Sequence, residues 1–149
     1  MEDLFFVKAE SNDKDIERFI SIEKTAVEEY TYSGITEYSE AKEEIEKSNV
    51  FFIYRGDTLV GSCEYIIKDE NTAVLGGLIV LAEFRGSGIA RAAALFRIDK
   101  VKNYKNVYLV THPHNSKVII LYLSLGFKIT EWKNNYWGDG QPRILISRI

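Results

Sequence analysis

A short basic segment rich in glycine has the residue types needed to bind an anion. It reads RGSGIA over residues 85–90 and follows the apolar segment Leu78–Val80. Gly86 and Gly88 leave the backbone unshielded, so its N–H groups can approach a phosphate closely. Arg85 adds a charged donor, and the dipole of the helix predicted to begin here stabilises an anion by typically 0.3–1 kcal/mol. This turn therefore predicts a phosphate site.

Two common nucleotide motifs do not fit this turn. A Rossmann fingerprint needs a third small residue where Arg91 stands, and a first strand near the start of the domain. A P-loop needs Gly-Lys followed by Ser or Thr, a run that the sequence lacks. Taken alone, the turn is equally compatible with an ordinary connection between a strand and a helix.

A second segment, residues 115–127, places an asparagine and a tyrosine on one face of a short helix. It reads NSKVIILYLSLGF, in which Asn115 and Tyr122 lie two helical turns apart. On its own this pattern is also that of a helix N-cap followed by a packed tyrosine. One predicted helix and one predicted strand separate the segment from the glycine turn, so both can serve one site.

Together the two segments resemble the GNAT N-acetyltransferase superfamily. The acetyl-CoA motif of that family, Arg/Gln-x-x-Gly-x-Gly/Ala, is matched by Arg85, Gly88 and Ala90. The later family motif runs from Asn through Tyr to Gly-Phe, and is matched by Asn115, Tyr122, Gly126 and Phe127. The motifs fall within residues 75–127, whereas the order of predicted elements resembles the family over nearly the whole chain.

The resemblance implies a role for each matching position. The backbone of Leu78 and Val80 would pair with the pantetheine arm as an added strand would. The N–H groups of residues 85–90 would hold the pyrophosphate, Asn115 would bind the arm, and Tyr122 would lie beside the thioester sulfur as general acid. The predicted cofactor-binding residues are Leu78, Ile79, Val80, Arg85, Gly86, Ser87, Gly88, Ile89, Ala90, Asn115 and Tyr122.

The reaction that the resemblance implies is direct attack of an amine on the thioester carbonyl. A backbone N–H, expected to be that of Val80, would polarise the carbonyl as it gains charge. Proton transfer from a tyrosine of pKa about 10 to a thiolate of pKa about 8.5 is uphill by about 2 kcal/mol. We therefore expect Tyr122 to stabilise the leaving sulfur by a hydrogen bond and to transfer its proton late.

The identity of the general base is less evident from the sequence. Deprotonating a lysine-like amine at pH 7 requires about 4.6 kcal/mol, against about 1 kcal/mol for an α-amine. Many members of the family place a glutamate between Thr72 and Val80, where this chain has no acid. Glu64, on the preceding predicted strand, is the candidate base, although an outward-facing, solvated glutamate is equally compatible. His112, His114 and a water chain to bulk solvent could also accept the proton.

The segment between the last two predicted strands, residues 132–143, is rich in aromatic and polar residues. Tyr136, Trp137 and Asp139 are candidates for a wall of the acceptor site that attracts a cationic amine. The alternative is a hairpin loop whose aromatic side chains cover the edge of the core or a dimer contact. The opposite wall is predicted to come from tyrosines in and after the first helix: Tyr30, Tyr32 and Tyr38.

The elements that must position these residues predict an α/β fold (α+β by some schemes) with one mixed central sheet. Their order is β-α-α-β-β-β-α-β-α-β-β, with strands 4 and 5 splayed apart to hold CoA, as the resemblance implies. Caps are predicted at Asn12 or Asp13, at Ser39, and at Asn115 or Ser116. The predicted strands are Leu4–Ala9, Val50–Tyr54, Thr58–Lys68, Thr72–Val80, Asn106–Thr111, Phe127–Trp132 and Arg143–Ile149.

Length and composition favour one cytoplasmic domain over residues 1–149. The net charge is −3, which gives no bulk attraction to nucleic acid or to an anionic membrane. The single cysteine, Cys63, excludes an internal disulfide and suits a reducing compartment. The N-terminal residues lack a signal-peptide pattern, and the longest apolar run, residues 73–82, is too short to span a bilayer.

These observations predict transfer of an acetyl group from acetyl-CoA to a primary amine in a ternary complex, by a monomer or homodimer without a metal. The acidic chain favours a cationic small-molecule amine, whereas the lack of an evident base favours the α-amine of a peptide. A non-catalytic acyl-CoA sensor is the main competing hypothesis. A nucleotide-binding protein is a further one, and the net charge opposes RNA binding.

Overall fold

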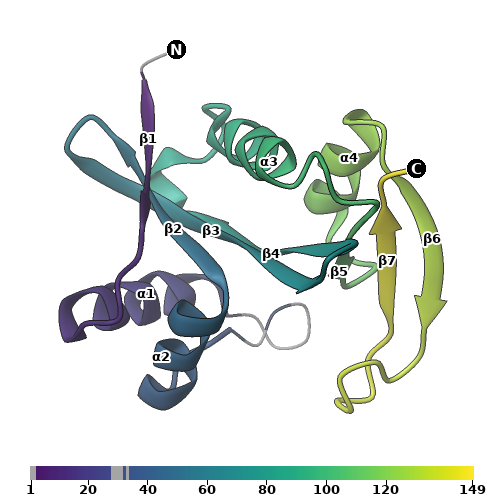
Figure 1. Cartoon of the computed structure of the whole chain (residues 1–149), viewed down its shortest axis with the longest axis horizontal. Coiled ribbons are helices and arrows are strands. Elements are labelled where there is room, and N and C mark those ends of the chain that lie inside the picture. The colour runs from purple at the N-terminus through teal and green to yellow at the C-terminus, as the bar shows by residue number, and fades with distance from the viewer. Residues whose placement is uncertain (1–2, 28–31, 33) are drawn as a thin grey trace.

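A computed structural model describes residues 3–27, 32 and 34–149, in which seven strands form one mixed sheet (Figure 1). The strands lie side by side in the order β1-β2-β3-β4-β5-β7-β6. All neighbouring pairs are antiparallel except β4 and β5, which the α3 crossover makes parallel. The strands are β1 Leu4–Lys8, β2 Asn49–Arg55, β3 Thr58–Asp69, β4 Thr72–Val80, β5 Asn106–Thr111, β6 Lys128–Lys133 and β7 Arg143–Ser147.

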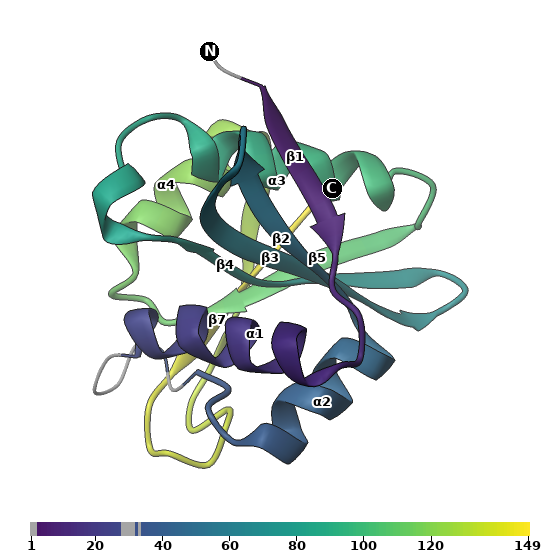
Figure 2. The ribbon, with the colours of Figure 1, turned by 90° about the vertical axis from the view of Figure 1, so that its left-hand side faces the viewer.

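Four α-helices cover the two faces of the sheet. Helices α1 (Asp13–Ala26) and α2 (Tyr38–Lys47) lie on one face, and α3 (Ile89–Lys100) and α4 (Ser116–Ser124) lie on the other (Figure 2). A short 3-10 helix, η1 (Ala82–Phe84), links β4 to the glycine turn. This element order confirms the predicted fold class.

The predicted start of a helix is correct where a neighbouring side chain caps it. Asn12 caps α1 by accepting a hydrogen bond from the N–H of Asp15 at 2.8 Å, as predicted. The predicted cap at Ser39 is wrong, because α2 begins at Tyr38 after Glu37, which makes no side-chain cap bond. The hydroxyl of Tyr38 instead donates to Asp13 and ties the start of α2 to that of α1.

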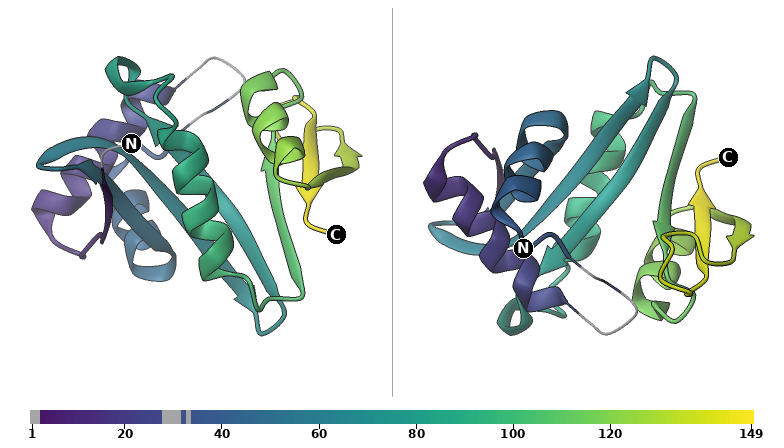
Figure 3. Two further views of the ribbon diagram at one scale, coloured as in Figure 1. Left: turned by 90° about the horizontal axis from the view of Figure 1, so that it is seen from above. Right: turned by 90° about the horizontal axis from the view of Figure 1, so that it is seen from below.

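Strands β4 and β5 separate along their length, as predicted. They pair only at Thr72–Val74 and 106–108, and Figure 3 shows them diverging from that end. Beyond Val74, no described strand lies against the β5-facing edge of β4. The backbone groups along this edge therefore lack the strand partners that a continuous sheet would supply.

A bulge in β4 changes which face its side chains point to. Tyr65 of β3 pairs with Leu75 and Cys63 pairs with Leu78, so β4 has one residue more than β3 across this interval. The extra residue lies at Gly76 and Gly77. Leu75 packs in the core under α3 and α4, whereas Ile79, four residues later, packs under α1 and α2. One inserted residue reverses the alternation of a strand, which explains this switch.

Candidate active site

The glycine turn presents backbone rather than side chains to the start of α3. Gly86 and Gly88 have φ of 82° and 84°, in the region that favours glycine, and Gly88 is the N-cap of α3. A Cβ built at Gly86 would meet no atom within 4 Å, so the backbone there is open to a ligand. The side chains of the turn are engaged locally, since Arg85 Nε donates to the Val80 carbonyl at 3.0 Å and Ser87 Oγ to the Phe84 carbonyl at 2.6 Å.

The predicted cofactor residues lie around the opening between β4 and β5. Leu78, Ile79 and Val80 form the end of β4 beyond its last pairing with β5. Ile89 is buried and fixes the start of α3 to the core, and Ala90 follows it in the first turn. These positions fit a long cofactor arm lying along β4 with its phosphates at the start of α3.

Asn115 precedes the first residue of α4, but its side chain does not cap the helix. Its Nδ2 donates to Thr111 Oγ1 at 3.1 Å, which links α4 to the end of β5. The sequence allowed either Asn115 or Ser116 as the cap, and the structure puts Asn115 at the N-cap position without a side-chain cap bond. Its amide is thereby held beside the end of β5.

Tyr122, on α4, points into the core with only 2% of its surface exposed. Its ring packs edge-on against Phe127 with the ring centroids 5.4 Å apart. Burial raises the pKa of its hydroxyl, and the nearby Arg97 guanidinium opposes that rise. The hydroxyl accepts a hydrogen bond from Arg97 Nη2, which leaves its own proton available for another acceptor.

Arg97 is a buried arginine that the sequence analysis did not single out. It is 1% exposed, and its Nη1 donates to the carbonyls of Glu64 at 3.0 Å and Gly76 at 2.8 Å. Among the described residues no carboxylate pairs with it. Arg97 therefore fixes the β4 bulge and brings a positive charge to Tyr122. It lies four residues after Ala93 on the apolar face of α3, and this spacing was the signal available in the sequence.

Glu64 lies on the opposite face of the sheet from Arg97 and is only 5% exposed. The solvated orientation that the sequence left open is therefore wrong. A Cβ at Gly76 would lie 2.6 Å from Glu64 Cγ, so the carboxyl fills the space that this glycine leaves. Burial raises the pKa of Glu64 well above its usual value, with further contributions from the carboxyls of Glu44 and Glu23. A carboxyl with a raised pKa beside the bulge is suited to act as a base.

Two further acids and Tyr32 surround Glu64. Glu23 on α1 is 2% exposed and accepts hydrogen bonds from the Tyr32 hydroxyl at 2.7 Å and from the Ile35 N–H at 3.1 Å. The Tyr32 hydroxyl lies 3.2 Å from the position that a Cβ of Gly77 would occupy. Sequence reasoning missed Glu23 and Glu44, because each looks like a helix-surface acid when read locally. Tyr30 lies outside the described residues.

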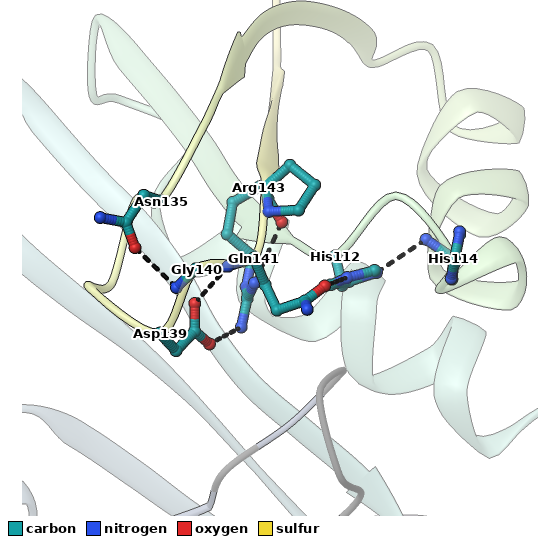
Figure 4. Close-up of polar contacts among 8 residues, drawn as sticks. His112, His114, Asn135, Asp139, Gly140, Gln141 and Arg143 are labelled. Carbon is teal, nitrogen blue, oxygen red and sulfur yellow. Dashed lines mark hydrogen bonds and ion pairs between the residues drawn. The ribbon is translucent and has the colours of Figure 1, made fainter.

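The loop between β6 and β7 is closed by its own hydrogen bonds (Figure 4). Asp139 accepts the Gln141 N–H at 2.9 Å and pairs with Arg143 at 3.0 Å, and these contacts hold the pKa of its carboxyl low. The side chains of Tyr136 and Trp137 pack against each other, and Trp137 is 62% exposed. Asp139 therefore already has a cationic partner in Arg143, at the start of β7, which reduces its attraction for an amine.

His112 connects this loop to the start of α4. Its Nδ1 accepts the His114 N–H at 3.0 Å, so in this tautomer Nε2 carries the proton and donates to Gln141 Oε1, also at 3.0 Å (Figure 4). The ring is 1% exposed. Both ring nitrogens of His112 already have partners, which favours Glu64 over His112 as the base.

Neither metal-binding nor membrane-spanning features occur in the described part of the chain. No group of three or more His, Cys, Asp or Glu residues at positions 3–27, 32 or 34–149 is arranged to hold a metal ion. Over the same residues no helix combines the length and the apolar character needed to cross a bilayer.

Comparison with solved structures shows the same fold in several acetyltransferases. A ribosomal-protein-S18-alanine N-acetyltransferase from Escherichia coli aligns with a TM-score of 0.76 and 19% identity, over 99% of this chain and 93% of that one. A chimeric spermidine N-acetyltransferase from Vibrio cholerae gives 0.76 and 19%, over 98% and 95%. A GNAT family acetyltransferase from Elizabethkingia anophelis with acetyl-CoA bound gives 0.75 and 15%, over 99% of both chains.

Comparison of the sequence identifies a family but no individual relative. No curated protein matches this chain significantly. The family model for the acetyltransferase (GNAT) family matches residues 19–127, which include the β4 bulge, the glycine turn and Tyr122. With the split between β4 and β5 and the open turn at the start of α3, this match shows that the chain belongs to the GNAT family of acetyl-CoA-dependent N-acetyltransferases.

Proposed function

We propose that this protein transfers an acetyl group from acetyl-CoA to a primary amine, with Glu64 as base and Tyr122 as acid. One observation carries the proposal: the buried Glu64 carboxyl and the buried Tyr122 hydroxyl are linked to the same β4 bulge from opposite faces of the sheet. Glu64 fills the space at Gly76 on the α1/α2 face. On the α3/α4 face, Arg97 joins the Gly76 carbonyl to the Tyr122 hydroxyl. The attacking nitrogen and the leaving sulfur are different substituents of the reacting carbon, so a base and an acid that lie apart can serve one each.

Acetyl-CoA fits the open edge of β4 and the glycine turn. The backbone of Leu78 and Val80 would pair with the pantetheine arm, and the N–H groups at residues 85–90 would hold the pyrophosphate. The Asn115 amide, which donates to Thr111 at the end of β5, would bind the arm. The bound acetyl-CoA of the Elizabethkingia anophelis neighbour, which shares the fold, supports this donor.

In the proposed reaction Glu64 removes a proton from the ammonium form of the acceptor, directly or through water. The amine nitrogen then bonds to the acetyl carbonyl carbon, a backbone N–H at the end of β4 stabilises the developing oxyanion, and the carbon–sulfur bond breaks. The Tyr122 hydroxyl donates a hydrogen bond to the departing thiolate and finally its proton. The acetylated nitrogen then loses its second proton, which returns through water to the Tyr122 phenolate, and Glu64 releases the first proton to solvent. The net products are the acetamide, CoA and one proton. The positive charge of Arg97 lowers the cost of negative charge at Tyr122 and the sulfur.

A non-catalytic acyl-CoA sensor is the second candidate, and release of free CoA distinguishes the two. The purified chain is mixed with acetyl-CoA and a panel of primary amines, including alkylamines and a peptide with a free N-terminus. We expect CoA release with at least one amine and a drop of about tenfold or more for Tyr122→Phe. Cys63 gives little background in a thiol assay, because burial raises its pKa to about 11. Cofactor binding without turnover on any amine, unaltered by Tyr122→Phe, would establish the sensor.

The proposal includes a cytoplasmic location, where the lone cysteine stays reduced and acetyl-CoA is available to the turn. The neighbours of known activity act on spermidine in one case and on an alanine of ribosomal protein S18 in another. Both acceptor classes, a small cationic amine and a peptide N-terminus, are therefore compatible with this fold.

A further inference from the structure

Three carboxylates from three elements face one another beside the β4 bulge, and we call Glu23, Glu44 and Glu64 the acidic recess. Glu23 and Glu64 are buried and Glu44 is half-buried. The charges of Glu44 and Glu23 both act on Glu64, so the three groups lie within electrostatic reach of one another. Across residues 3–27, 32 and 34–149, no lysine or arginine forms an ion pair with any of the three.

One oxygen of the acidic recess lacks a hydrogen-bond donor. Glu23 is satisfied by the Tyr32 hydroxyl and the Ile35 N–H. Glu64 Oε2 is fully buried, and no N–H or O–H group of a described residue donates to it. A hydrogen bond between the Glu64 and Glu44 carboxyls raises the pKa of Glu64 and requires that one of the two be protonated, so it is lost when both are ionised. Leaving a buried acceptor unsatisfied is unfavourable by about 1–3 kcal/mol, and by more when the group is charged. A ligand that brings both N–H donors and positive charge would remove this penalty.

The arrangement of the carboxylates favours an organic cation over a metal ion. A divalent metal needs several oxygens directed at one point about 2–2.6 Å away. No group of acids among the described residues is arranged in that way. An ammonium group has three N–H donors pointing in different directions, so it can be held by carboxylates that do not share a centre.

A second anionic position lies next to the recess. A cavity of about 230 Å³ on α2 is lined by Glu40, Glu43, Glu44, Lys47 and Ile35. Glu43 is paired with Lys47 at 2.8 Å, whereas Glu40 and Glu44 form no ion pair with any residue that the structure describes. Glu44 belongs to both the cavity and the acidic recess. A ligand with a positive charge at each end could therefore place one charge in the recess and the other in the cavity, each near carboxylates. Ile35 offers the cavity an apolar surface for the methylenes between those charges.

We propose that the acceptor is an aliphatic diamine or polyamine, with the reacting amine at Glu64 and a second ammonium between Glu44 and Glu40. This inference rests on the proposed acetyl transfer and narrows it to one substrate class. A monoamine or a peptide N-terminus would satisfy Glu64 but leave the cavity acids without a cation. The ammonium between Glu44 and Glu40 therefore determines affinity, whereas the reacting amine lies at Glu64, the proposed base.

Binding is tested first, because it does not depend on turnover. The protein saturated with CoA is titrated by calorimetry with 1,4-diaminobutane and with butylamine, which lacks only the second charge. We expect the diamine to bind at least about tenfold more tightly. Glu44→Gln and the exposed variant Glu40→Gln should each remove most of that advantage. Glu70→Gln, an exposed acid in the β3–β4 turn, should leave it intact. Equal binding of the two amines, or an advantage that survives both substitutions, would overturn the proposal.

Turnover then separates failure of the acceptor class from failure of the acetyl transfer itself. We expect kcat/KM for the diamine to exceed those for butylamine and for a peptide N-terminus by at least about tenfold, with Glu44→Gln acting mainly on KM. A peptide as good as or better than the diamine would refute the acceptor class while keeping the acetyltransferase. Tighter diamine binding without CoA release from any amine would refute acetyl transfer while keeping the diamine site.

Discussion

At the β4 bulge, the two faces of the sheet carry charges of opposite sign, and the charge on each face lacks an ion-pair partner among the described residues. The α1/α2 face holds Glu23, Glu44 and Glu64 with no cation paired to them among the described residues. The α3/α4 face holds Arg97 with carbonyls and a hydroxyl as its partners. Unpaired buried charge is unfavourable for folding, and retaining it on both faces is expected where charge develops during a reaction. In the proposed reaction, this separation would put a proton acceptor on the side of the amine and positive charge on the side of the departing thiolate.

The largest effect is expected for removal of the base. Glu64→Gln keeps the shape of the side chain but cannot take a proton, so kcat with alkylamines should fall by about 10²–10³-fold. The rise of kcat/KM with pH that belongs to Glu64 should disappear with it. Steady-state CoA release across pH measures both effects, with Glu70→Gln as the control. Retention of wild-type kcat by Glu64→Gln would assign the base to water or another group.

Removal of the opposite charge is expected to have the next largest effect. Arg97→Met leaves the Glu64 and Gly76 carbonyls without their donor, which should lower the free energy of unfolding by about 2–4 kcal/mol. Without the positive charge, kcat should fall about 10–100-fold. A double substitution with Tyr122→Phe should be less harmful than the sum of the two, because both act on the same thiolate.

Lys100→Met, an exposed charge removed from the same helix, is the matched control for Arg97→Met. Chemical denaturation and steady-state kinetics measure the two consequences separately. If the single losses in kcat add fully in the double variant, Arg97 acts only through the fold.

The stability of the acidic face should depend on pH. The pKa of Glu64 in the folded protein lies above its ordinary value of 4.5, so the folded state holds the proton more tightly than the unfolded chain. Stability is therefore lost as the pH rises from about 4.5 toward the raised pKa. Glu64→Gln should be more stable than wild type at pH 8. Its Tm should rise by about 2–4 °C for each kcal/mol by which the free energy of unfolding increases. Thermal melts from pH 4 to 8 test this, and parallel curves for the two proteins would refute it.

The smallest effect is expected for the acid of the β6–β7 loop. Asp139 is already paired with Arg143 and lies at a partly exposed position. Surface pairs of this kind contribute little to stability or binding. Asp139→Asn should therefore change KM for any cationic amine by no more than about twofold. A much larger rise in KM would place acceptor recognition in this loop instead of the acidic recess.

Much of the fold followed from patterns of neighbouring residues. The break between the predicted strands Val50–Tyr54 and Thr58–Lys68, the cap at Asn12 and the glycine turn are set by residues within a few positions of each other, so sequence reasoning located them. The cap of α2 was misplaced, because a tertiary contact from Tyr38 to Asp13 fixes that helix start.

Within the site, local sequence patterns were enough to predict the residues proposed to bind the cofactor: the glycine turn at residues 85–90, and Asn115 and Tyr122 two helical turns apart. Both depend on local backbone geometry and helix periodicity, which a single segment contains. The charges that act on the reaction were decided only by the tertiary structure. The extra residue of β4 reverses its alternation and opens a space for Glu64, and packing of α1 and α2 brings Glu23 and Glu44 to that carboxyl. Strand register and helix docking are long-range, so no local pattern in the sequence reports them.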